Sequence, residues 1–333
     1  MLSRRAFSLA ASAALAAVLA GAGLTFGGAP ALAQTALTIS HPLPVNSHYG
    51  AGATAFKETL ERLTNGRYRV TIQRNDNERE ILESVQLGTL DLGITSTGPV
   101  GNFVPVIRNL DVPFLFRDRA HAHGVLDGPI GKEMLEAFKP RGMVALAWLE
   151  NGFRHLTNSR REVRTPEEVQ GLKIRTMENQ VHMRAFTTLG ALPTPMAFSE
   201  LTTALQQGTV DGQENPIPVI VGNNLNQVQK HLTLTGHVYS PAVLVASAQL
   251  MGRLNADDQR AFAEAAAAAA KANRDRVSSD EATGVEALRS RGMTVITEVD
   301  RSKFQAALAP AYQVYARELD GALLDRIRNW RSN

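Results

Sequence analysis

The chain has 333 residues, with 35 lysines and arginines against 32 acidic residues and a formal net charge of +3. Removing Arg4 and Arg5 with an N-terminal leader leaves 33 of the 35 basic groups against 32 acidic ones, so electrostatics give no case for nucleic-acid binding. Cysteine is absent, which excludes disulfides, thiolate metal sites, cysteine nucleophiles and the lipid-modified cysteine of a bacterial lipoprotein.

The first 33 residues have the pattern of an export signal. Arg4 and Arg5 precede an uncharged apolar stretch that ends in Ala31-Leu32-Ala33, an A-x-A cleavage site, so the mature chain is expected to start at Gln34. The segment Ser3-Arg4-Arg5-Ala6-Phe7 also resembles a twin-arginine motif, which leaves the Sec and Tat routes both open. Export of a chain without disulfides points to a bacterial periplasm.

A membrane anchor is the alternative interpretation of this leader. A spanning helix needs about 20 mostly apolar residues in a row, and Gly27, Gly28 and Pro30 interrupt the stretch. About 300 residues remain after cleavage, more than one hydrophobic core usually supports, so two lobes are expected.

The first elements alternate between strand and helix patterns. The apolar run 36–40 suits a buried strand, a helix is expected over 49–63 and ends at Asn65-Gly66, and residues 67–74 alternate with strand periodicity. This alternation predicts α/β layers.

A weak internal repeat links the two halves of the chain. Val85-Gln86-Leu87-Gly88-Thr89-Leu90-Asp91 is followed, 120 positions later, by Leu205-Gln206-Gln207-Gly208-Thr209-Val210-Asp211. Each glycine can cap a helix in the left-handed conformation, and each aspartate begins the turn or strand that follows. A common helix-to-strand turn is the alternative explanation.

In the second half, Thr165-Pro166-Glu167-Glu168 predicts a capped short helix that Gly171 ends, and residues 172–175 then predict a strand. Residues 257–289 are helical throughout, a length that fits a helix crossing from one lobe to the other. A final amphipathic region, 303–327, is expected to kink at Pro310. Its apolar positions pack on the chain itself or, as the alternative, on a second subunit.

Three motifs in order resemble the TRAP transporter solute-binding proteins of the DctP family. They are Gly171-Leu172-Lys173-Ile174-Arg175, then Pro193-Thr194-Pro195-Met196-Ala197-Phe198-Ser199-Glu200, and Val210-Asp211-Gly212-Gln213-Glu214-Asn215-Pro216. In that family the residues matching Arg175 and Asn215 grip a substrate carboxylate, and the residue matching Phe198 packs nearby. Arg154 matches the family's second arginine when one extra residue is allowed before Arg175.

The resemblance implies a type II-like periplasmic binding protein of two α/β lobes with a long lobe-spanning helix. Lobe I would hold residues 35–152 plus 241–280, and lobe II residues 153–240 plus 281–333. The protein would capture a small organic acid by hinge closure, deliver it to a TRAP membrane permease and perform no reaction itself. A monomer is expected. The alternatives are an exported lyase or hydrolase of organic acids using Glu78 or Glu150 as base, or a ligand-binding module for a sensor.

The chemistry of the matched residues agrees with this interpretation. The guanidinium fork of Arg175 fits a carboxylate with two parallel hydrogen bonds, and a strand's carboxyl end is where ligands gather in open α/β sheets. Asn215 offers a donor and an acceptor. A structural ion pair with Glu178, and a turn before Pro216, are the alternative roles of these two residues.

Further candidates lie outside the three motifs. Asn75, Glu78 and Thr97 follow strands of the first lobe and could bind hydroxyl or keto groups of the substrate. Trp148 and Glu150 flank Arg154, and His182 is a candidate from the second lobe.

Motifs of other functions lack their required context. The segment 50–55 resembles a dinucleotide-binding turn but lies inside a helical stretch, and His121-Ala122-His123 places its imidazoles on different helix faces. The sequence therefore predicts no metal, no cofactor and no catalytic residue.

Overall fold

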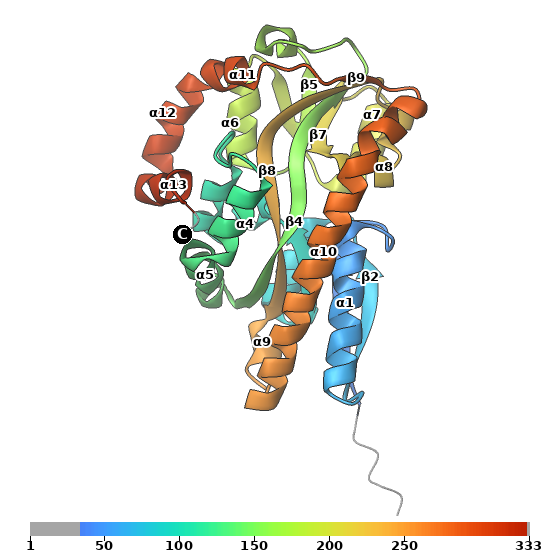
Figure 1. Cartoon of the computed structure of the whole chain (residues 1–333), viewed down its shortest axis with the longest axis vertical. Helices are drawn as coiled ribbons and strands as arrows, with labels where there is room; N and C mark the ends of the chain where they lie inside the picture. The colour runs from blue at the N-terminus through green and yellow to red at the C-terminus, as the bar shows by residue number, and fades with distance from the viewer. Residues whose placement is uncertain (1–33, 332–333) are drawn as a thin grey trace, which may run out of the picture. The chain divides into compact units, whose positions relative to one another are not determined.

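The computed structural model describes residues 34–331. The export signal predicted for residues 1–33 lies outside the described residues. All strands within 34–331 belong to one sheet, in the order β2-β1-β3-β8-β4-β7-β5-β6, and the short strand β9 (Thr294–Ile296) pairs with β8 (Figure 1). None of the helices described is long and apolar enough to cross a bilayer.

One end of the sheet is a parallel βαβαβ unit, here called the first unit. It consists of β1 (Thr35–His41), α1 (His48–Leu63), β2 (Tyr68–Arg74), α2 (Glu78–Leu87) and β3 (Leu92–Ser96), and β1 pairs in parallel with both β2 and β3. The strands predicted over 36–40 and 67–74 and the helix predicted over 49–63 are confirmed.

The other end of the sheet repeats this arrangement in a second unit. It consists of β5 (Lys173–Thr176), α6 (Gln180–Thr188), β6 (Leu192–Pro195), α7 (Phe198–Gln206) and β7 (Gly212–Pro216), and β5 pairs in parallel with β6 and β7. Gly88 and Gly208 both take positive φ after their helices, at 75° and 69°, as the repeat predicted.

Two long antiparallel strands join the two units. β4 (Met143–Asn158) pairs with β7, β8 (His231–Ser247) pairs with β3, and β4 and β8 pair with each other along most of their lengths. The register between β4 and β8 shifts at Glu150/Gly152, where Gly152 has φ 120°. Such an irregularity bends a strand locally, at the point where β4 passes from one unit to the other.

Helix α10 (Ala256–Ser290) lies alongside β4 and packs on α1 and on α8 (Ile217–Gly222) (Figure 1). Its bounds confirm the long helix predicted over 257–289. Its alanine-rich face lets α1 approach closely, and Phe262 meets Phe56 edge to face at 5.9 Å between ring centroids. Each such buried ring contributes roughly 1.5–3 kcal/mol.

Shorter helices complete the fold. They are α3 (Thr97–Val100), α4 (Arg119–Asp127), α5 (Pro129–Glu136), α9 (Ala248–Met251) and the 3-10 helices Pro105–Asp111, Lys139–Arg141, Pro166–Val169 and Leu225–Gln227. The capping box at Thr165 is present, and the short helix that it begins is of the 3-10 type.

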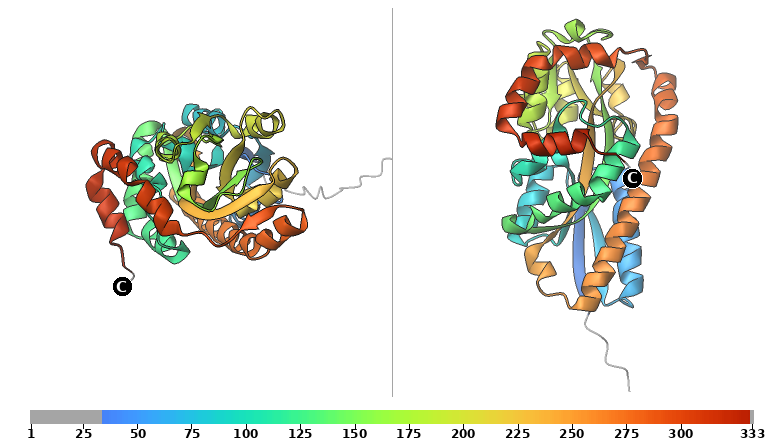
Figure 2. Two further views of the ribbon diagram at one scale, coloured as in Figure 1. Left: turned by 90° about the horizontal axis from the view of Figure 1, so that it is seen from above. Right: turned by 60° about the vertical axis from the view of Figure 1, so that its left-hand side comes forward.

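The C-terminal region differs from its prediction. The single kinked helix expected over 303–327 is three helices, α11 (Arg301–Ala307), α12 (Ala309–Glu318) and α13 (Gly321–Arg328). Pro310 stands in the first turn of α12, and a second break follows because Asp320 caps α13 by accepting a hydrogen bond from Leu323 N. Helix α13 lies beside α4 and α5 (Figure 2), and the apolar side chains of α12 and α13 share one core cluster with those of α4 and α5, whereas Phe304 of α11 packs in a separate cluster.

Candidate functional site

A small cavity lies between the two units, near the carboxyl ends of their strands. Its cavity volume is about 20 Å³, roughly room for one water molecule, so the lining side chains lie close together. Its wall brings together five of the residues predicted from the sequence: Arg175, Asn215, Arg154, Phe198 and Glu78. The remaining lining residues are Pro42, Leu43, Tyr49, Ser96, Asn151, Met177 and Val219.

Arg175 is a buried cation without an acidic partner. Its side chain donates from Nε and Nη2 to the carbonyl oxygen of Met196, at 3.1 and 2.8 Å. Among residues 34–331, no carboxylate lies within 4.0 Å of its guanidinium, and Glu178 instead faces Arg79 at 3.6 Å. Burial and the charge of Arg154 lower the pKa of Arg175 to about 10, so Arg175 is still charged at neutral pH.

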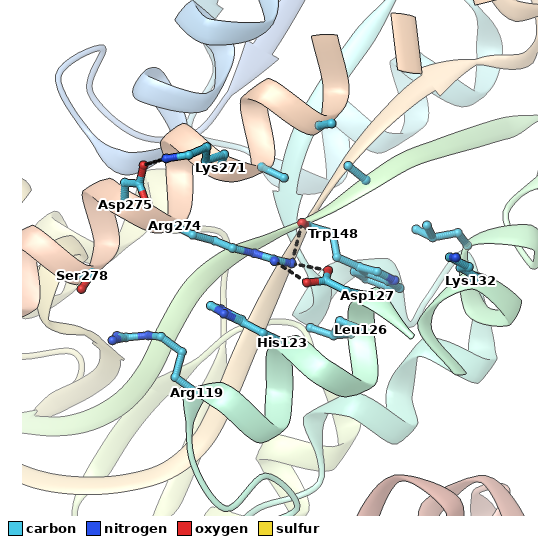
Figure 3. A pocket seen from close by; sticks show the side chains of 14 residues that line it. Arg119, His123, Leu126, Asp127, Lys132, Trp148, Lys271, Arg274, Asp275 and Ser278 are labelled. Carbon is cyan, nitrogen blue, oxygen red and sulfur yellow. Dashed lines mark hydrogen bonds and ion pairs between the residues drawn. The ribbon is translucent and has the colours of Figure 1, made fainter. Parts of the chain in front are cut away.

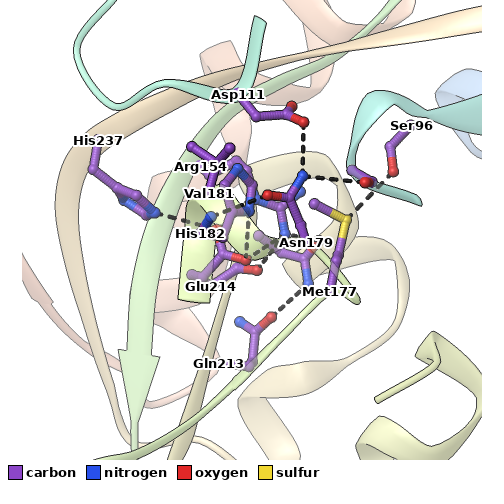
Figure 4. A network of polar contacts seen from close by, with 12 residues as sticks. Ser96, Asp111, Arg154, Met177, Asn179, Val181, His182, Gln213, Glu214 and His237 are labelled. Carbon is purple, nitrogen blue, oxygen red and sulfur yellow. Dashed lines mark hydrogen bonds and ion pairs between the residues drawn. The ribbon is translucent and has the colours of Figure 1, made fainter. Parts of the chain in front are cut away.

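Arg154 is held by Glu214 in a fully buried ion pair (Figure 4). Nε of Arg154 lies 2.5 Å from Glu214 Oε2, and Nη2 donates to Glu214 Oε1 and to its backbone carbonyl at 2.8 and 2.6 Å. The remaining nitrogen, Nη1, is buried and has no hydrogen-bond partner within the described part of the chain. This nitrogen is therefore an unsatisfied buried donor of a residue that lines the cavity.

Two histidines stand behind the pair. His237 Nε2 lies 3.2 Å from Glu214 Oε2, and His182 Nδ1 lies 3.9 Å from Oε1. Burial alone would raise the pKa of Glu214, but the charge of Arg154 and hydrogen bonds from His237 and Arg154 hold it well below its ordinary value. Burial lowers the pKa of His182 to about 3, so its ring is neutral and adds no charge beside the Arg154–Glu214 pair.

Asn215 and Phe198 flank the two arginines. Asn215 is buried at the end of β7, where its Oδ1 accepts from Arg154 Nη2 at 3.3 Å and its Nδ2 donates to Gln213 Oε1 at 2.5 Å. Phe198 is the first residue of α7, and its ring centroid lies 5.9 Å from Cζ of Arg175, within cation–π range. The ring therefore shields one side of the charged group from water.

Glu78 faces the same cavity from the first unit. It is the first residue of α2, and its carboxylate accepts hydrogen bonds from Ser96 N at 2.6 Å and Ser96 Oγ at 3.1 Å. Burial raises the pKa of Glu78, against the lowering effects of the Ser96 hydrogen bonds and of the charges of Arg175 and Arg154. The cavity thus has cationic groups on one side and a carboxylate on the other.

The structure does not bring the other predicted residues into this cavity. Asn75 Oδ1 accepts from Asn77 N at 3.0 Å within the turn before α2. Thr97 Oγ1 donates to Asp111 at 2.7 Å, and His182 lies behind the Arg154 pair. Trp148 donates to Gly131 O at 3.0 Å in a different part of the core.

Glu150 also points away from the cavity, because the register shift between Glu150 and Gly152 reverses the alternation of side chains that would otherwise place it on the same face as Arg154. Its carboxylate contacts Arg119 at 2.8 Å and His123 at 3.0 Å, whereas the adjacent Asn151 lines the cavity. Asn151 Oδ1 lies 3.1 Å from Nε2 of the buried His48. Gly152, a glycine inside a strand pattern, was the sequence feature that could have indicated the bulge that brings Asn151 to the cavity in place of Glu150.

Sequence reasoning also missed Tyr49 and Met177. Tyr49 is 1% exposed, and its hydroxyl has no hydrogen-bond partner among residues 34–331. It belongs to the first turn of α1, inside an apolar pattern that conceals a polar role. Met177 directly follows β5, and its sulfur lies 3.4 Å from Oγ of Ser96, the last residue of β3.

A second hollow lies on another part of the molecule, between α4, α5, β4 and α10 (Figure 3). Two cations of its α10 wall already face carboxylates. Arg274 contacts Asp127 with two hydrogen bonds of 2.7 and 2.8 Å, and Lys271 contacts Asp275 at 2.6 Å. The charge of Arg274 is therefore compensated within the chain, in contrast to that of Arg175.

Comparison with known proteins places this geometry in a family. The model of "Bacterial extracellular solute-binding protein, family 7", DctP, matches residues 39–318. The chain belongs to this family. A "Solute-binding protein" of Verminephrobacter eiseniae is 53% identical over 304 residues, which cover 90% of this chain and 91% of that protein.

Solved structures of family members have the same fold. A TRAP periplasmic solute-binding protein from Polaromonas sp. JS666, bound to D-erythronate, is 51% identical with a TM-score of 0.88, covering 90% of this chain and 100% of that one. A second one, from Bordetella, has density interpreted as pantoate; it is 49% identical with a TM-score of 0.88 and the same coverage. The chain is therefore a two-lobed periplasmic solute-binding protein of the TRAP type, a family of receptors and not of enzymes.

Proposed function

We propose that this protein holds the carboxylate of a small organic acid at Arg175, with Arg154 Nη1 and Asn215 as further hydrogen-bond partners and Phe198 as an apolar wall. The observation that carries the proposal is the buried guanidinium of Arg175 without a carboxylate within 4.0 Å in the described residues. A buried charge normally pairs with an opposite charge, and here an anionic ligand supplies it. Erythronate and pantoate, the ligands of the two similar structures, are small acids of this kind.

Closure of the two lobes would complete the site. With lobe I at residues 35–152 plus 241–280 and lobe II at 153–240 plus 281–333, Glu78 and Tyr49 come from one lobe and Arg175 and Asn215 from the other. A ligand that contacts both sides gains contacts when the lobes meet and so favours the closed state. Small-angle scattering should show a smaller radius of gyration at ligand saturation.

Delivery of the acid to the membrane subunits of a TRAP permease is the biological role that the family supports. The protein would act as a monomer, because Phe304, Leu308, Tyr315 and Leu323, the side chains that would form a helical dimer face, are buried within the chain. Light scattering that gives a dimer mass would contradict the monomer.

Substitution of Arg175 tests the anchor role. Losing one partner of a buried, hydrogen-bonded charge pair typically costs about 2–5 kcal/mol, so Arg175→Ala should weaken binding of D-erythronate or pantoate by roughly one and a half to four decades. Arg175→Lys should fall between wild type and alanine, because lysine keeps the charge but loses the planar fork.

The melting temperature separates this role from a structural one. Arg175 has no ion pair to lose in the free protein, so the unliganded melting temperature should stay within a few degrees of wild type. Arg62→Ala, at an exposed arginine of α1, is the matched control. Calorimetric titration that finds near wild-type affinity in Arg175→Ala would refute the proposal.

A further inference from the structure

The two arginines that line the cavity differ in whether a carboxylate of the chain neutralises them, and this difference bears on the charge of the ligand. Glu214 neutralises Arg154 through a bidentate contact, whereas Arg175 has no such partner. The wall near Arg175 therefore offers one uncompensated positive charge, which matches one ligand carboxylate. The only other charged side chain that lines the described cavity is Glu78.

Glu78 is fixed in place by the first unit. Both of its carboxylate oxygens accept hydrogen bonds from Ser96, one from the backbone N–H and one from the hydroxyl. A carboxylate held in this way still has free lone pairs, so it can accept hydrogen bonds from ligand hydroxyl groups. A second ligand carboxylate at this end would meet a like charge, which disfavours the ionised form of both groups.

Two donors in the cavity have no partner in the chain. Tyr49 Oη and Arg154 Nη1 are both buried and without a hydrogen bond among residues 34–331. An unpaired buried polar group costs about 1–3 kcal/mol, so ligand oxygens that satisfy these groups gain affinity. Tyr49 projects from α1 of the first unit, which also carries Glu78, so both groups can meet hydroxyls of one ligand.

We infer that this protein selects hydroxylated monocarboxylates, with Glu78 accepting from the ligand hydroxyls and excluding dicarboxylates, and with Tyr49 hydrogen-bonding the same hydroxylated end. The inference rests on the proposed carboxylate anchor at Arg175 and adds the chemistry of the opposite end of the ligand. Neither Glu78 nor Tyr49 belongs to the Arg154–Glu214 ion pair, so each can be substituted while Glu214 still neutralises Arg154.

Three four-carbon acids separate the contribution of the ligand hydroxyls from the effect of a second carboxylate. D-Erythronate has one carboxylate and hydroxyls, succinate has two carboxylates, and butyrate has one carboxylate and no hydroxyl. Calorimetric titration of the full mature chain should give the tightest binding for D-erythronate, with succinate and butyrate each weaker by about tenfold or more.

Glu78→Gln removes the charge and keeps an acceptor for the Ser96 N–H. It should strengthen succinate binding by about tenfold and weaken D-erythronate binding, so that the ratio of succinate to D-erythronate affinity rises. Glu80→Gln, at an exposed glutamate of the same helix, should leave the ratio unchanged. Tyr49→Phe should weaken D-erythronate by about tenfold without lowering the unliganded melting temperature, because the hydroxyl has no partner to lose.

The outcomes separate this inference from the function on which it rests. If Arg175→Ala abolishes binding but Glu78→Gln leaves the ratio of succinate to D-erythronate affinity at its wild-type value, the anchor stands and the inference is overturned. Wild-type protein that binds succinate as tightly as D-erythronate overturns it as well. Failure of every acid to bind wild-type protein would overturn both.

Discussion

In the first unit, Asp91 Oδ2 accepts a hydrogen bond from the backbone N–H of Thr38 at 2.8 Å, and in the second unit Asp211 Oδ2 accepts one from Lys173 at 2.9 Å. Thr38 and Lys173 occupy the same place in β1 and β5, since Ile39 pairs with Leu92 and Ile174 pairs with Gly212. The two ends of the sheet thus share helix stops, aspartate contacts and strand register.

The side chains that these matching positions present are different. Arg175 in β5 corresponds to Ser40 in β1, and Glu214 in β7 corresponds to Ile94 in β3. The first residues of α2 and α7, Glu78 and Phe198, both line the cavity, one as a charge and one as an apolar wall. The shared backbone determines where side chains meet the ligand, and the substitutions between the units give the cavity its polarity.

Breaking the buried ion pair between Arg154 of β4 and Glu214 of the second unit should have the largest effect on stability. Glu214→Gln leaves the charge of Arg154 buried and uncompensated, which typically costs about 3–5 kcal/mol of unfolding free energy. The matching change in the first unit, Ile94→Val, removes one methyl group from the core and should cost about 0.5–1.5 kcal/mol. Chemical denaturation of both variants measures the difference, and equal losses would contradict it.

A smaller, pH-dependent effect is expected where the two units meet. Asp111 is buried and accepts a hydrogen bond from Thr97 Oγ1 at 2.7 Å. It accepts a second one from Asn179 Nδ2, also at 2.7 Å (Figure 4). Burial raises the pKa of Asp111 to about 6 from its ordinary 3.8, against the hydrogen bonds and the charge of Arg154. The folded state therefore binds this proton more tightly than the unfolded chain does, and the stabilisation, complete below pH 3.8, is lost as the pH rises through 6.

Asparagine at this position keeps a carbonyl for Asn179 and an amide for Thr97 but does not ionise. Asp111→Asn should therefore be more stable than wild type at pH 8, by about 1–3 kcal/mol, and nearly equal to it at pH 4. Denaturant unfolding at both pH values checks the sign. A stability difference that does not change with pH would show that Asp111 does not titrate in this range.

Much of the fold could be predicted from the sequence, because local patterns determine it. The alternation at residues 67–74, the glycine stops at 88 and 208 and the long helical run over 257–289 each appear in the structure at the expected place. Arg175, Asn215 and Phe198 were predicted together because their motifs follow one another at family-like spacing. All three line one cavity.

The predictions differ from the structure where tertiary contacts decide the arrangement. Glu150 and Trp148 flank Arg154 in sequence, but the bulged register of β4 and the partner Arg119 turn Glu150 away from the cavity. The C-terminal region has the apolar period of one helix, and the cap at Asp320 divides it. Tyr49 escaped notice because only the surrounding structure shows that its hydroxyl is buried without a partner.

The smallest predicted effect concerns the hydrogen bond between an aspartate and a strand backbone N–H that both units contain. Asp91→Ala and Asp211→Ala each leave one backbone N–H, that of Thr38 or Lys173, without its acceptor, which should lower the unfolding free energy by about 1–2 kcal/mol. Because the two aspartates play the same part in matching units and neither lines the cavity, the losses should be similar and ligand affinity should stay at the wild-type level.

Asp275→Ala is the matched control, since its exposed pair with Lys271 should contribute less than about 1 kcal/mol. Parallel denaturation and titration of the three variants decide the matter. If only one of the two aspartate variants lost unfolding free energy, the two aspartates would not contribute equally to stability, although their sequences repeat. Water would then replace the lost hydrogen bond to the backbone N–H in one unit only.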